Sequence, residues 1–364
     1  MKIIHCADLH LDSKMTSNLS KEQAKERKNE ILRTYVHMVD YAKANDVRII
    51  LIAGDLFDTR NVSAMVRNTV KDTIVSNPEI DFLYLKGNHD NDNFLSKLDE
   101  IPKNLKLFSD EWTSYSYLDG RVVITGLELT RENQVTAYNS LVLSHDSYNI
   151  VTLHGQTGEY KSAHVAENIS LSDLKNKNID YLALGHVHSH ICEKLDGRGV
   201  YCYSGCLEGR GFDECGQKGF VLIDIDEKTL SARTKMVSCS ARTLYTLPVD
   251  VTGVMSTNEA AKQIELSLNE NPLPSNSLVK IVLTGTLNVE CELSLEYLSE
   301  LFSDYYYFVK LENATTLQIN YSDYEKDESL KGEFVRMVKN SDLDEAKKSE
   351  VIRCGIMALS GEEI

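Results

Sequence analysis

The sequence predicts an α/β protein with a large N-terminal domain followed by a smaller one. Over the first 226 residues, short apolar runs alternate with stretches of helical periodicity. Several of these runs are too uniformly apolar for a sheet with one face in water, so we expect strands that are buried on both sides. The composition changes after Asp226, which indicates that a second domain follows.

Eight strands are predicted in the first part of the chain. They are Ile3–Ala7, Arg48–Ala53, Phe82–Leu85, Val122–Leu127, Ile150–Leu153, Tyr181–Leu184, Gly199–Tyr203 and Phe220–Ile225. Between the first two, Ile31, Tyr35, Val39 and Ala42 recur at i, i+4, i+8 and i+11. This spacing predicts a helix with one apolar stripe facing the sheet.

The region after residue 243 predicts a small α/β domain in the order β-α-β-α-β-β. Its elements are Thr243–Val249, Asn258–Leu268, Leu278–Thr286, Leu293–Phe302, Tyr305–Leu311 and Thr316–Tyr321, with a loop at Asn271–Ser277. The charged tail keeps helical periodicity in two stretches, and Ser341 with Asp344 resembles a capping box before the second. We therefore expect three parts, residues 1–235, 240–324 and 325–364.

The bulk composition is that of an ordinary globular protein, with 42% hydrophobic and 26% charged residues among 364. No apolar run approaches the roughly 20 residues of a membrane-spanning helix, and the N-terminus has no signal-peptide core. The eight cysteines are scattered without a CxxC pair, as expected for reduced thiols. These features predict a cytoplasmic protein without a membrane partner.

The net charge of −16 argues against a protein that grips nucleic acid over a wide basic face. It does not exclude a nuclease, because bound divalent cations supply positive charge locally. The charge therefore constrains how nucleic acid would be held, and a small-molecule substrate remains open.

Five polar clusters follow predicted strands. They are Asp8-Leu9-His10, Gly54-Asp55, Gly87-Asn88-His89-Asp90, His154-Gly155 and Gly185-His186-Val187-His188. Functional groups in open α/β sheets gather outside the carboxyl ends of the strands, so these clusters should meet in one crevice. Their carboxylate, amide and imidazole groups suit Mn²⁺, Fe or Zn²⁺ better than Mg²⁺ or Ca²⁺. A bridging carboxylate can hold two such ions about 3.5–4 Å apart.

The motifs DLH, GDLFD, GNHD, HG and GHVH, in this order, resemble those of calcineurin-like metallophosphoesterases. The resemblance implies a four-layer β-sandwich flanked by helices, with the small α/β domain as a cap and a helical C-terminal tail. The opening IIHCADLHLDS, the segment GDLFDTR and the later YCYSGCLEGRGFDECGQKGF are similar to the SbcD branch of DNA-repair nucleases and to YhaO-type proteins. The similarity covers residues 1–226 well and the remainder only in general layout.

The resemblance also assigns roles to residues. One metal would be held by Asp8, His10, Asp55 and His188, and the other by Asp55, Asn88, His154 and His186. His89 would protonate or stabilise the leaving oxygen, and Asp90 would orient His89 through a hydrogen bond. Asp58 stands where archaeal and eukaryotic relatives carry a histidine, which puts a second catalytic histidine in doubt.

The family implies a Mn²⁺-dependent nuclease acting on single- or double-stranded DNA ends, with an SbcC-like coiled-coil ATPase and a homodimer as partners. The stripe Val351, Ile352, Ile356 and Leu359 would dock on that ATPase or pack against the small domain. A stand-alone phosphodiesterase or phosphatase acting on a nucleotide-like molecule is the alternative. A binding subunit without catalysis conflicts with the intact ligand set.

Other residues have competing interpretations. Arg60, Arg210 and Lys218 are phosphate contacts or plain surface cations, and the run Tyr305–Phe308 is a base-stacking platform or, preferably, part of a strand. His190 has a substrate or supporting role or, preferably, a structural or solvated one. The remaining histidines are expected to be structural or solvated: His5, His37, His145 and His164.

Overall fold

The computed structural model describes residues 1–15, 19–58, 62–90, 94–98, 100–134, 136–158 and 168–360. It divides into two units, Met1–Thr243 and Leu244–Ile364. Residue 235, where we expect the first domain to end, lies within a strand of the first unit. The separation of the tail as a domain of its own remains a prediction.

The first unit contains two six-stranded sheets, which confirms the mixed α/β class. The first sheet has the order β14 (Ala232–Ser238), β13 (Gly219–Ile225), β1 (Lys2–Cys6), β2 (Val47–Ala53), β3 (Asp81–Leu85) and β4 (Leu105–Leu107). The second has the order β11 (Ile191–Lys194), β12 (Val200–Tyr203), β10 (Tyr181–Gly185), β7 (Tyr148–His154), β6 (Val122–Gly126) and β5 (Thr113–Tyr117). All eight predicted strands are present. Each sheet has a parallel centre, and β13, β14, β11 and β5 pair antiparallel.

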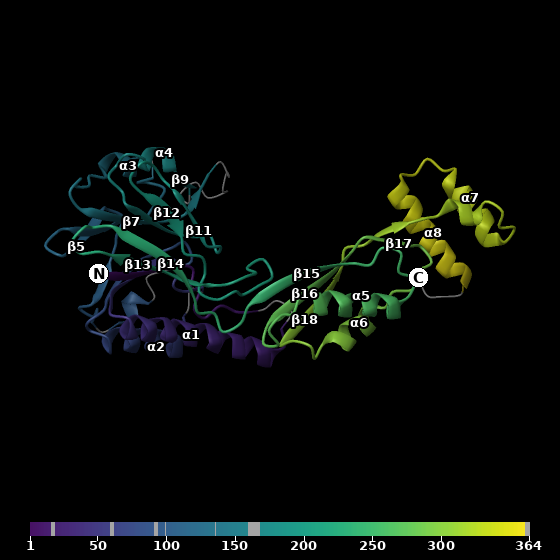
Figure 1. Ribbon diagram of the computed structural model, residues 1–364, viewed down its shortest axis with the longest axis horizontal. Helices are drawn as coiled ribbons and strands as arrows, with labels where there is room; N and C mark the ends of the chain where they lie inside the picture. The colour runs from purple at the N-terminus through teal and green to yellow at the C-terminus, as the bar shows by residue number, and fades with distance from the viewer. Residues whose placement is uncertain are drawn as a thin grey trace. The chain divides into compact units, whose positions relative to one another are not determined.

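Helices cover the outer faces of both sheets, so this unit has four layers (Figure 1). The helices α1 (Lys21–Ala44) and α2 (Ala64–Val75) pack on the first sheet, and the short α3 (Ala137–Ser140) and α4 (Leu171–Leu174) lie over the second. A short 3₁₀ helix, Leu95–Lys97, precedes β4, and β8 (Gln156–Thr157) pairs with β9 (Asn168–Ile169).

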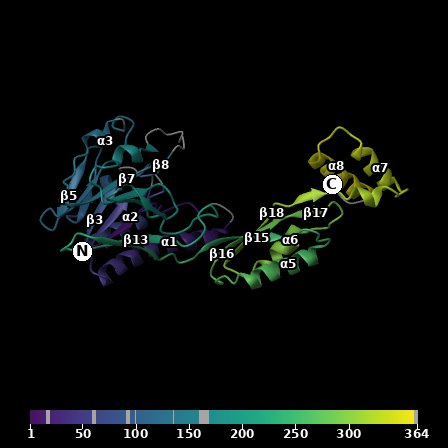
Figure 2. The same cartoon turned by 45° about the horizontal axis from the view of Figure 1, so that its top comes forward.

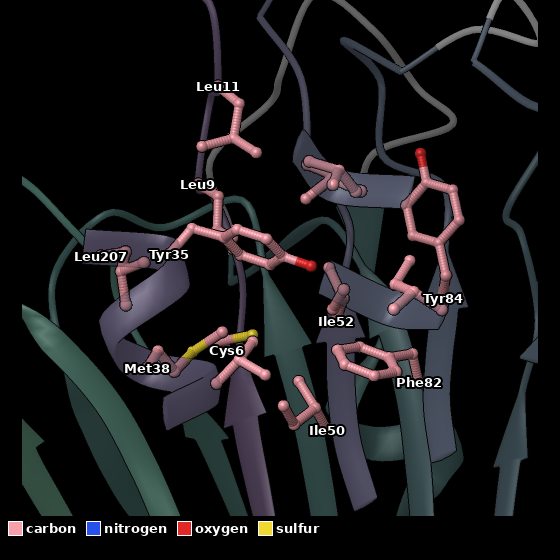
Figure 3. Packing of buried hydrophobic residues seen from close by; sticks show 14 of the residues in the cluster. Cys6, Leu9, Leu11, Tyr35, Met38, Ile50, Ile52, Phe82, Tyr84 and Leu207 are labelled. Atoms are coloured by element: carbon pink, nitrogen blue, oxygen red, sulfur yellow. The ribbon is translucent and has the colours of Figure 1, made fainter. Parts of the chain in front are cut away.

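The helix α1 begins at a capping box, in which Ser20 Oγ accepts from the Gln23 N–H and Gln23 Oε1 accepts from the Ser20 N–H. The four residues of its predicted stripe are all buried, which confirms that prediction. Met38 of this helix lies beside Cys6 of the sheet and Tyr35 points toward Ile52, within one apolar cluster (Figure 3). A second apolar layer fills the space between the two sheets, so both faces of β1, β2 and β3 are buried.

The second unit has a parallel sheet of β15 (Leu244–Asp250), β16 (Leu278–Thr284) and β18 (Phe308–Asn313), covered by α5 (Thr257–Glu270) and α6 (Leu295–Phe302) (Figure 2). A two-stranded sheet joins β17 (Thr286–Asn288) and β19 (Thr316–Gln318). The predicted strand Leu278–Thr286 is therefore broken at Gly285, whose φ is +97°. The predicted strand at Tyr305 begins only at Phe308, because Tyr305 closes a turn onto Phe302 after α6.

The tail forms a 3₁₀ turn, Tyr321–Tyr324, and the helices α7 (Leu330–Lys339) and α8 (Glu345–Ser360). Ile352 and Ile356 are buried against Val335 and Val338, so α8 packs on its own unit. Val351 and Leu359, the other members of the predicted stripe, are exposed.

The predicted capping box before α8 is wrong. Asp344 alone caps the helix by accepting from the Lys347 N–H, whereas the Ser341 hydroxyl donates to the Val338 carbonyl. Serine at this position completes the preceding turn and does not start the next helix. None of the helices in the described ranges has the length and hydropathy needed to cross a bilayer.

Candidate metal centre

The five polar clusters lie at the ends of adjacent parallel strands, as the sequence predicted. In the first sheet Asp8 follows β1, Asp55 follows β2 and Asn88 follows β3. In the second sheet His154 ends β7, opposite Gly185 at the end of β10. Main-chain hydrogen bonds tie these ends together, including Asp8 N–H to Gly54 O at 3.1 Å and His10 N–H to Asp55 O at 3.0 Å.

The backbone at these strand ends is strained. Four of the candidate ligands have positive φ, a conformation that non-glycine residues rarely adopt. They are Asp8 (φ 53°), His10 (φ 44°), Asp55 (φ 52°) and His186 (φ 96°). Such strain persists only where the surrounding structure enforces it, and it is common at functional sites.

One group of ligand atoms comes from Asp8, His10 and His188, which lie within 4.8 Å of one another. The Nε2 atoms of His10 and His188 are 3.2 Å apart, and His188 Nε2 is 3.9 Å from Asp8 Oδ1. Asp8 and His10 are almost completely buried. The group therefore brings together one carboxylate and two imidazoles, of which only His188 is partly exposed.

A second group comes from Asp8, Asp55 and His154. His154 Nε2 is 3.4 Å from Asp55 Oδ2 and 3.0 Å from Asn88 Oδ1. Asp55 Oδ2 is also 3.7 Å from His10 Nε2, so this carboxylate lies between the two groups. The His186 ring stands edge-on to the His154 ring at 5.4 Å, and the backbone N–H of His186 donates to both oxygens of Asp8.

The donor set fits a divalent metal. Two imidazoles have an acceptor at hydrogen-bond distance from Nδ1: Glu214 Oε1 at 2.6 Å for His188 and Ala53 O at 2.9 Å for His154. His10 Nδ1 lies 3.0 Å from Asp58 Oδ1, as an ion-pair contact. An Nδ1 proton directed outward leaves the Nε2 lone pair directed inward. The Nε2 atoms of His10 and His188 lie 3.2 Å apart, a separation that a shared proton or a bound cation can bridge.

The charges in the site also favour a cation. Burial raises the pKa of Asp8. Burial acts in the same direction on Asp55, but the hydrogen bond and charge of His154 outweigh it and lower the pKa of that carboxyl. Conversely, burial opposes protonation of His154, yet Asp55 raises its pKa to about 9. The ionised Asp55 carboxylate thus stabilises a positive charge beside it, here on the His154 imidazole.

An outer ring of ion pairs supports the histidines. Arg210 contacts Asp58 Oδ1 at 3.1 Å and Glu214 Oε1 at 2.8 Å, and its backbone N–H donates to Glu214 Oε2 at 2.7 Å. Glu214 holds His188 and Asp58 contacts His10, so Arg210 joins the two supports. Sequence reasoning assigned this role to neither Glu214 nor Asp58. Glu214 lies 26 residues beyond His188 in a polar segment, and no spacing in the sequence marks it.

Two of the three predicted phosphate contacts, Arg210 and Lys218, have partners within the protein. The Arg210 guanidinium is engaged by two carboxylates, and Lys218 is buried, where its Nζ donates to the His188 carbonyl at 2.8 Å. Lys218 therefore supports the loop that carries His188 and is not a surface cation. Arg60 lies outside the described residues.

His89 and Asp90 follow β3, beside the ligand groups. The His89 side chain is half-exposed, its ring stands 5.0 Å from that of His10, and its Nδ1 is 3.7 Å from Asp58 Oδ1. The Asp90 carboxylate accepts from the backbone N–H groups of Leu56, Phe57 and Gly87. The expected hydrogen bond from Asp90 to His89 is not among those of the described residues. Asp90 instead holds the Gly87–Asp90 turn against the loop after β2.

The other histidines differ in their surroundings. His5 is fully buried, its Nδ1 lies 2.9 Å from the Tyr181 hydroxyl, and burial lowers its pKa to about 3. His37 and His145 are exposed, and His164 lies outside the described residues. His190 Nδ1 is 3.0 Å from the Tyr203 carbonyl, at the start of the β11–β12 hairpin. These positions agree with the structural or solvated roles that we expected for His5, His37 and His145.

The chain is similar to several known proteins. It is 30% identical over 245 residues to the uncharacterized metallophosphoesterase YhaO of Bacillus subtilis, covering 64% of this chain and 59% of that protein. It is 24% identical over 324 residues to the DNA double-strand break repair protein Mre11 of Sulfolobus acidocaldarius, covering 83% of this chain and 79% of that protein. The chain thus spans about three fifths of the length of YhaO.

Among solved structures, TT1561 of Thermus thermophilus matches with a TM-score of 0.40 and 13% identity, over 65% of this chain and 98% of that one. The model of the calcineurin-like phosphoesterase family matches residues 1–190, more than half of the chain. This range includes all the residues to which the motifs assigned a role, and it ends before Arg210 and Glu214. The chain therefore belongs to the calcineurin-like phosphoesterase family.

Proposed function

We propose that this protein is a metal-dependent hydrolase, and specifically a Mn²⁺-dependent DNA nuclease of the SbcD type, which cleaves phosphodiester bonds in DNA repair together with an SbcC-like ATPase. The similarity to Mre11 carries the proposal, because its 324 residues extend beyond the metal centre into the second unit. A relative that shared only the phosphoesterase chemistry would not need to match there. That relative is named as a DNA double-strand break repair protein.

The family binds two divalent metals, and the candidate groups suggest how this chain would hold them. We assign Asp8, His10, Asp55 and His188 to one ion and Asp55, Asn88, His154 and His186 to the other. The position of Asp55 between the two groups supports its bridging role. The mixed oxygen and imidazole donors favour Mn²⁺ over Mg²⁺ or Ca²⁺. When bound, the two ions neutralise phosphate oxygens and lower the pKa of a bound water.

We assign His89 to the leaving group of the reaction. Its imidazole is accessible, stands beside the ligand His10, and has Asp58 near its Nδ1 atom. A protonated imidazole in this position donates a proton to the departing sugar oxygen, and the Asp58 carboxylate stabilises the protonated ring. Asp90 contributes indirectly, because it fixes the turn from which His89 projects.

The outward face of the tail helices supports the partner proposal. Ile352 and Ile356 pack inward, whereas Val351 and Leu359 of α8 and Met337 of α7 are exposed. An amphipathic helix pair with such a face suits a partner helix that brings its own apolar residues. We assign this face to the coiled coil of the ATPase. We also propose that the protein forms a homodimer, as the family resemblance implies.

The alternative is a stand-alone phosphodiesterase or phosphatase for a nucleotide-like molecule. The net charge of −16 favours it, since an acidic chain repels the extended phosphate backbone of DNA. In the nuclease, the two metals and the ATPase partner would have to offset this repulsion.

Hydrolysis assays separate these functions. The full chain is stripped of metal with a chelator, reloaded with Mn²⁺, and incubated with end-labelled single- and double-stranded oligonucleotides and with bis-p-nitrophenyl phosphate. The nuclease proposal predicts cleavage of both substrate classes, enhanced on DNA by the ATPase. Hydrolysis of the small ester without cleavage of either DNA, even with the ATPase added, would establish the alternative.

The variant His89→Ala tests the role of that residue. It removes no proposed metal ligand, so Mn²⁺ binding measured by calorimetry should stay unchanged. Cleavage should fall by about 10²–10⁴-fold, the usual contribution of general acid catalysis. Full activity in this variant would show that His89 is not the acid.

A further inference from the structure

Two cysteines lie opposite each other on the antiparallel strands β11 and β12. Cys192 and Cys202 are direct partners in the register of these strands. Opposed residues of an antiparallel pair point to the same face of the sheet, with Cα atoms about 4.5–5.5 Å apart. This separation lies inside the range of about 4.4–6.8 Å that a disulfide spans. The sequence did not reveal the pair, because nine residues, including a turn, lie between its members.

The two thiols differ in their access to solvent. Cys192 is exposed on β11, which is the edge strand of its sheet, whereas Cys202 is fully buried in the layer between the sheets. The side chains interact, and the hydrogen bond from Cys202 lowers the pKa of the Cys192 thiol to about 7. An oxidant can therefore reach one thiol, which is partly thiolate at neutral pH, and the second is already adjacent.

We propose that Cys192 and Cys202 form a reversible disulfide when the protein meets hydrogen peroxide. The Cys192 thiolate attacks the peroxide oxygen, which forms a sulfenic acid and releases water after protonation of the leaving oxygen. The Cys202 sulfur then attacks the sulfenic sulfur, and the Cys202 thiol proton passes to the departing hydroxide, which leaves as a second water. The two thiols lose two electrons and two protons in total, and hydrogen peroxide is reduced to two waters.

The disulfide would fasten a hairpin that adjoins the metal centre. The residue before β11 is His190, whose Nδ1 lies 3.0 Å from the carbonyl of Tyr203 at the end of β12. Beyond β12, the Cys206 N–H donates to the His188 carbonyl at 3.3 Å. Both ends of the hairpin therefore hold the loop that carries His188. Neither Cys192 nor Cys202 is one of the proposed ligands, so the proposal does not depend on the identity of the metal.

Thiol mapping by mass spectrometry tests the proposal. The metal-free full chain is treated with hydrogen peroxide, its free thiols are alkylated, and the proteolytic peptides are identified. We expect a cross-linked peptide containing Cys192 and Cys202, which disappears on treatment with dithiothreitol. Cys354→Ser, which changes another exposed cysteine, should leave the cross-link intact, and Cys192→Ser should abolish it.

A variant of the buried partner distinguishes a true pair from a single reactive thiol. In Cys202→Ala, Cys192 lacks its partner and should advance to sulfinic acid under conditions in which the native chain forms the cross-link. If Cys202→Ala does not fold, the native chain and Cys192→Ser decide the question. The proposal is overturned if peroxide leaves both thiols of the native chain open to alkylation. It is also overturned if Cys192 pairs with a different cysteine or becomes sulfinic acid while Cys202 remains alkylated.

Discussion

The two halves of the metal centre hold their histidines in different ways. In the half with His10 and His188, the Nδ1 atoms of these histidines face the carboxylates of Asp58 and Glu214. In the other half, His154 Nδ1 faces the main-chain carbonyl of Ala53, the last residue of β2. One half is therefore supported by charged side chains and the other by the sheet itself.

This difference determines what can disturb each half. The Ala53 carbonyl is fixed by the central strand, so the orientation of His154 depends on the fold. Asp58 and Glu214 are held by Arg210, and a single substitution can remove their charge without touching the sheet. A carboxylate partner also makes an imidazole a stronger ligand than a neutral carbonyl does. The carboxylate-supported half should therefore be the one that substitutions outside the ligand set can adjust.

The largest effect is expected where the two halves meet. Asp55→Asn removes the carboxylate that lies between them and should weaken both ions at once. Because such ions contribute several kcal/mol to stabilising the transition state, activity should fall by at least about 10³-fold. Metal content per chain and phosphodiester hydrolysis measure the effect. The exposed Asp146→Asn is the control, and a variant that lost only one ion would show that Asp55 belongs to a single half.

The fold-supported half is tested by a backbone substitution. Gly54 has a φ of +95°, and a Cβ there would lie 2.1 Å from His154 Nδ1. Gly54→Ala should therefore lower the free energy of unfolding by about 3 kcal/mol, the upper end of the range for such strain, and displace the His154 ring. Urea denaturation measures this loss.

Gly197→Ala provides the matched control for that substitution. A Cβ at Gly197 meets no atom within 4 Å, so its effect should stay within about 0.5 kcal/mol. Equal stabilities of the two variants would show that β2 does not hold His154 as rigidly as this structure indicates.

The carboxylate-supported half is tested by Glu214→Gln. The amide keeps the shape of the side chain and an acceptor for His188 but removes the buried charge. Affinity for one of the two Mn²⁺ ions should fall by about 10–100-fold, the usual cost of losing a partner of a ligating histidine. Calorimetry should resolve one weakened and one unchanged site. Glu193→Gln, on the exposed edge strand β11, is the control.

The sequence predicted the interior of this architecture better than its margins. Uniformly apolar runs such as Arg48–Ala53 were recognised as strands because both of their faces are buried. The strand β14 was missed, since most of Ala232–Ser238 is polar and the strand lies at a sheet edge. Its stability comes from pairing with β13 and not from its own side chains.

The same reasoning applies to the site. The ligand candidates follow strands directly, so their convergence follows from the rule for parallel sheets. Glu214 and Asp58 reach the histidines through side-chain contacts between loops, which neither periodicity nor spacing encodes. Asp90 is a different case: the family resemblance implied that it orients His89, and in the structure its carboxylate accepts from backbone N–H groups.

The smallest effect is expected from Asp58→Asn. Asp58 is more exposed than Glu214, and its ion pair with Arg210 is correspondingly screened by solvent. Loss of such a pair costs up to about 1 kcal/mol, so Mn²⁺ affinity should fall by no more than about fivefold. Calorimetry of Asp58→Asn and Glu214→Gln under the same conditions compares how much Mn²⁺ affinity each variant loses.

Asp58 also lies near the substrate side of the site, 3.7 Å from His89 Nδ1. If it acts through His89, Asp58→Asn should lower the turnover number more than it lowers metal affinity, and the loss should vanish in a His89→Ala background. A loss of Mn²⁺ affinity as large as that of Asp55→Asn would contradict the assignment of Asp58 to His89 rather than to the metal. Asp58 would then be a metal ligand, as its grouping with His10 and His89 within 4.8 Å permits.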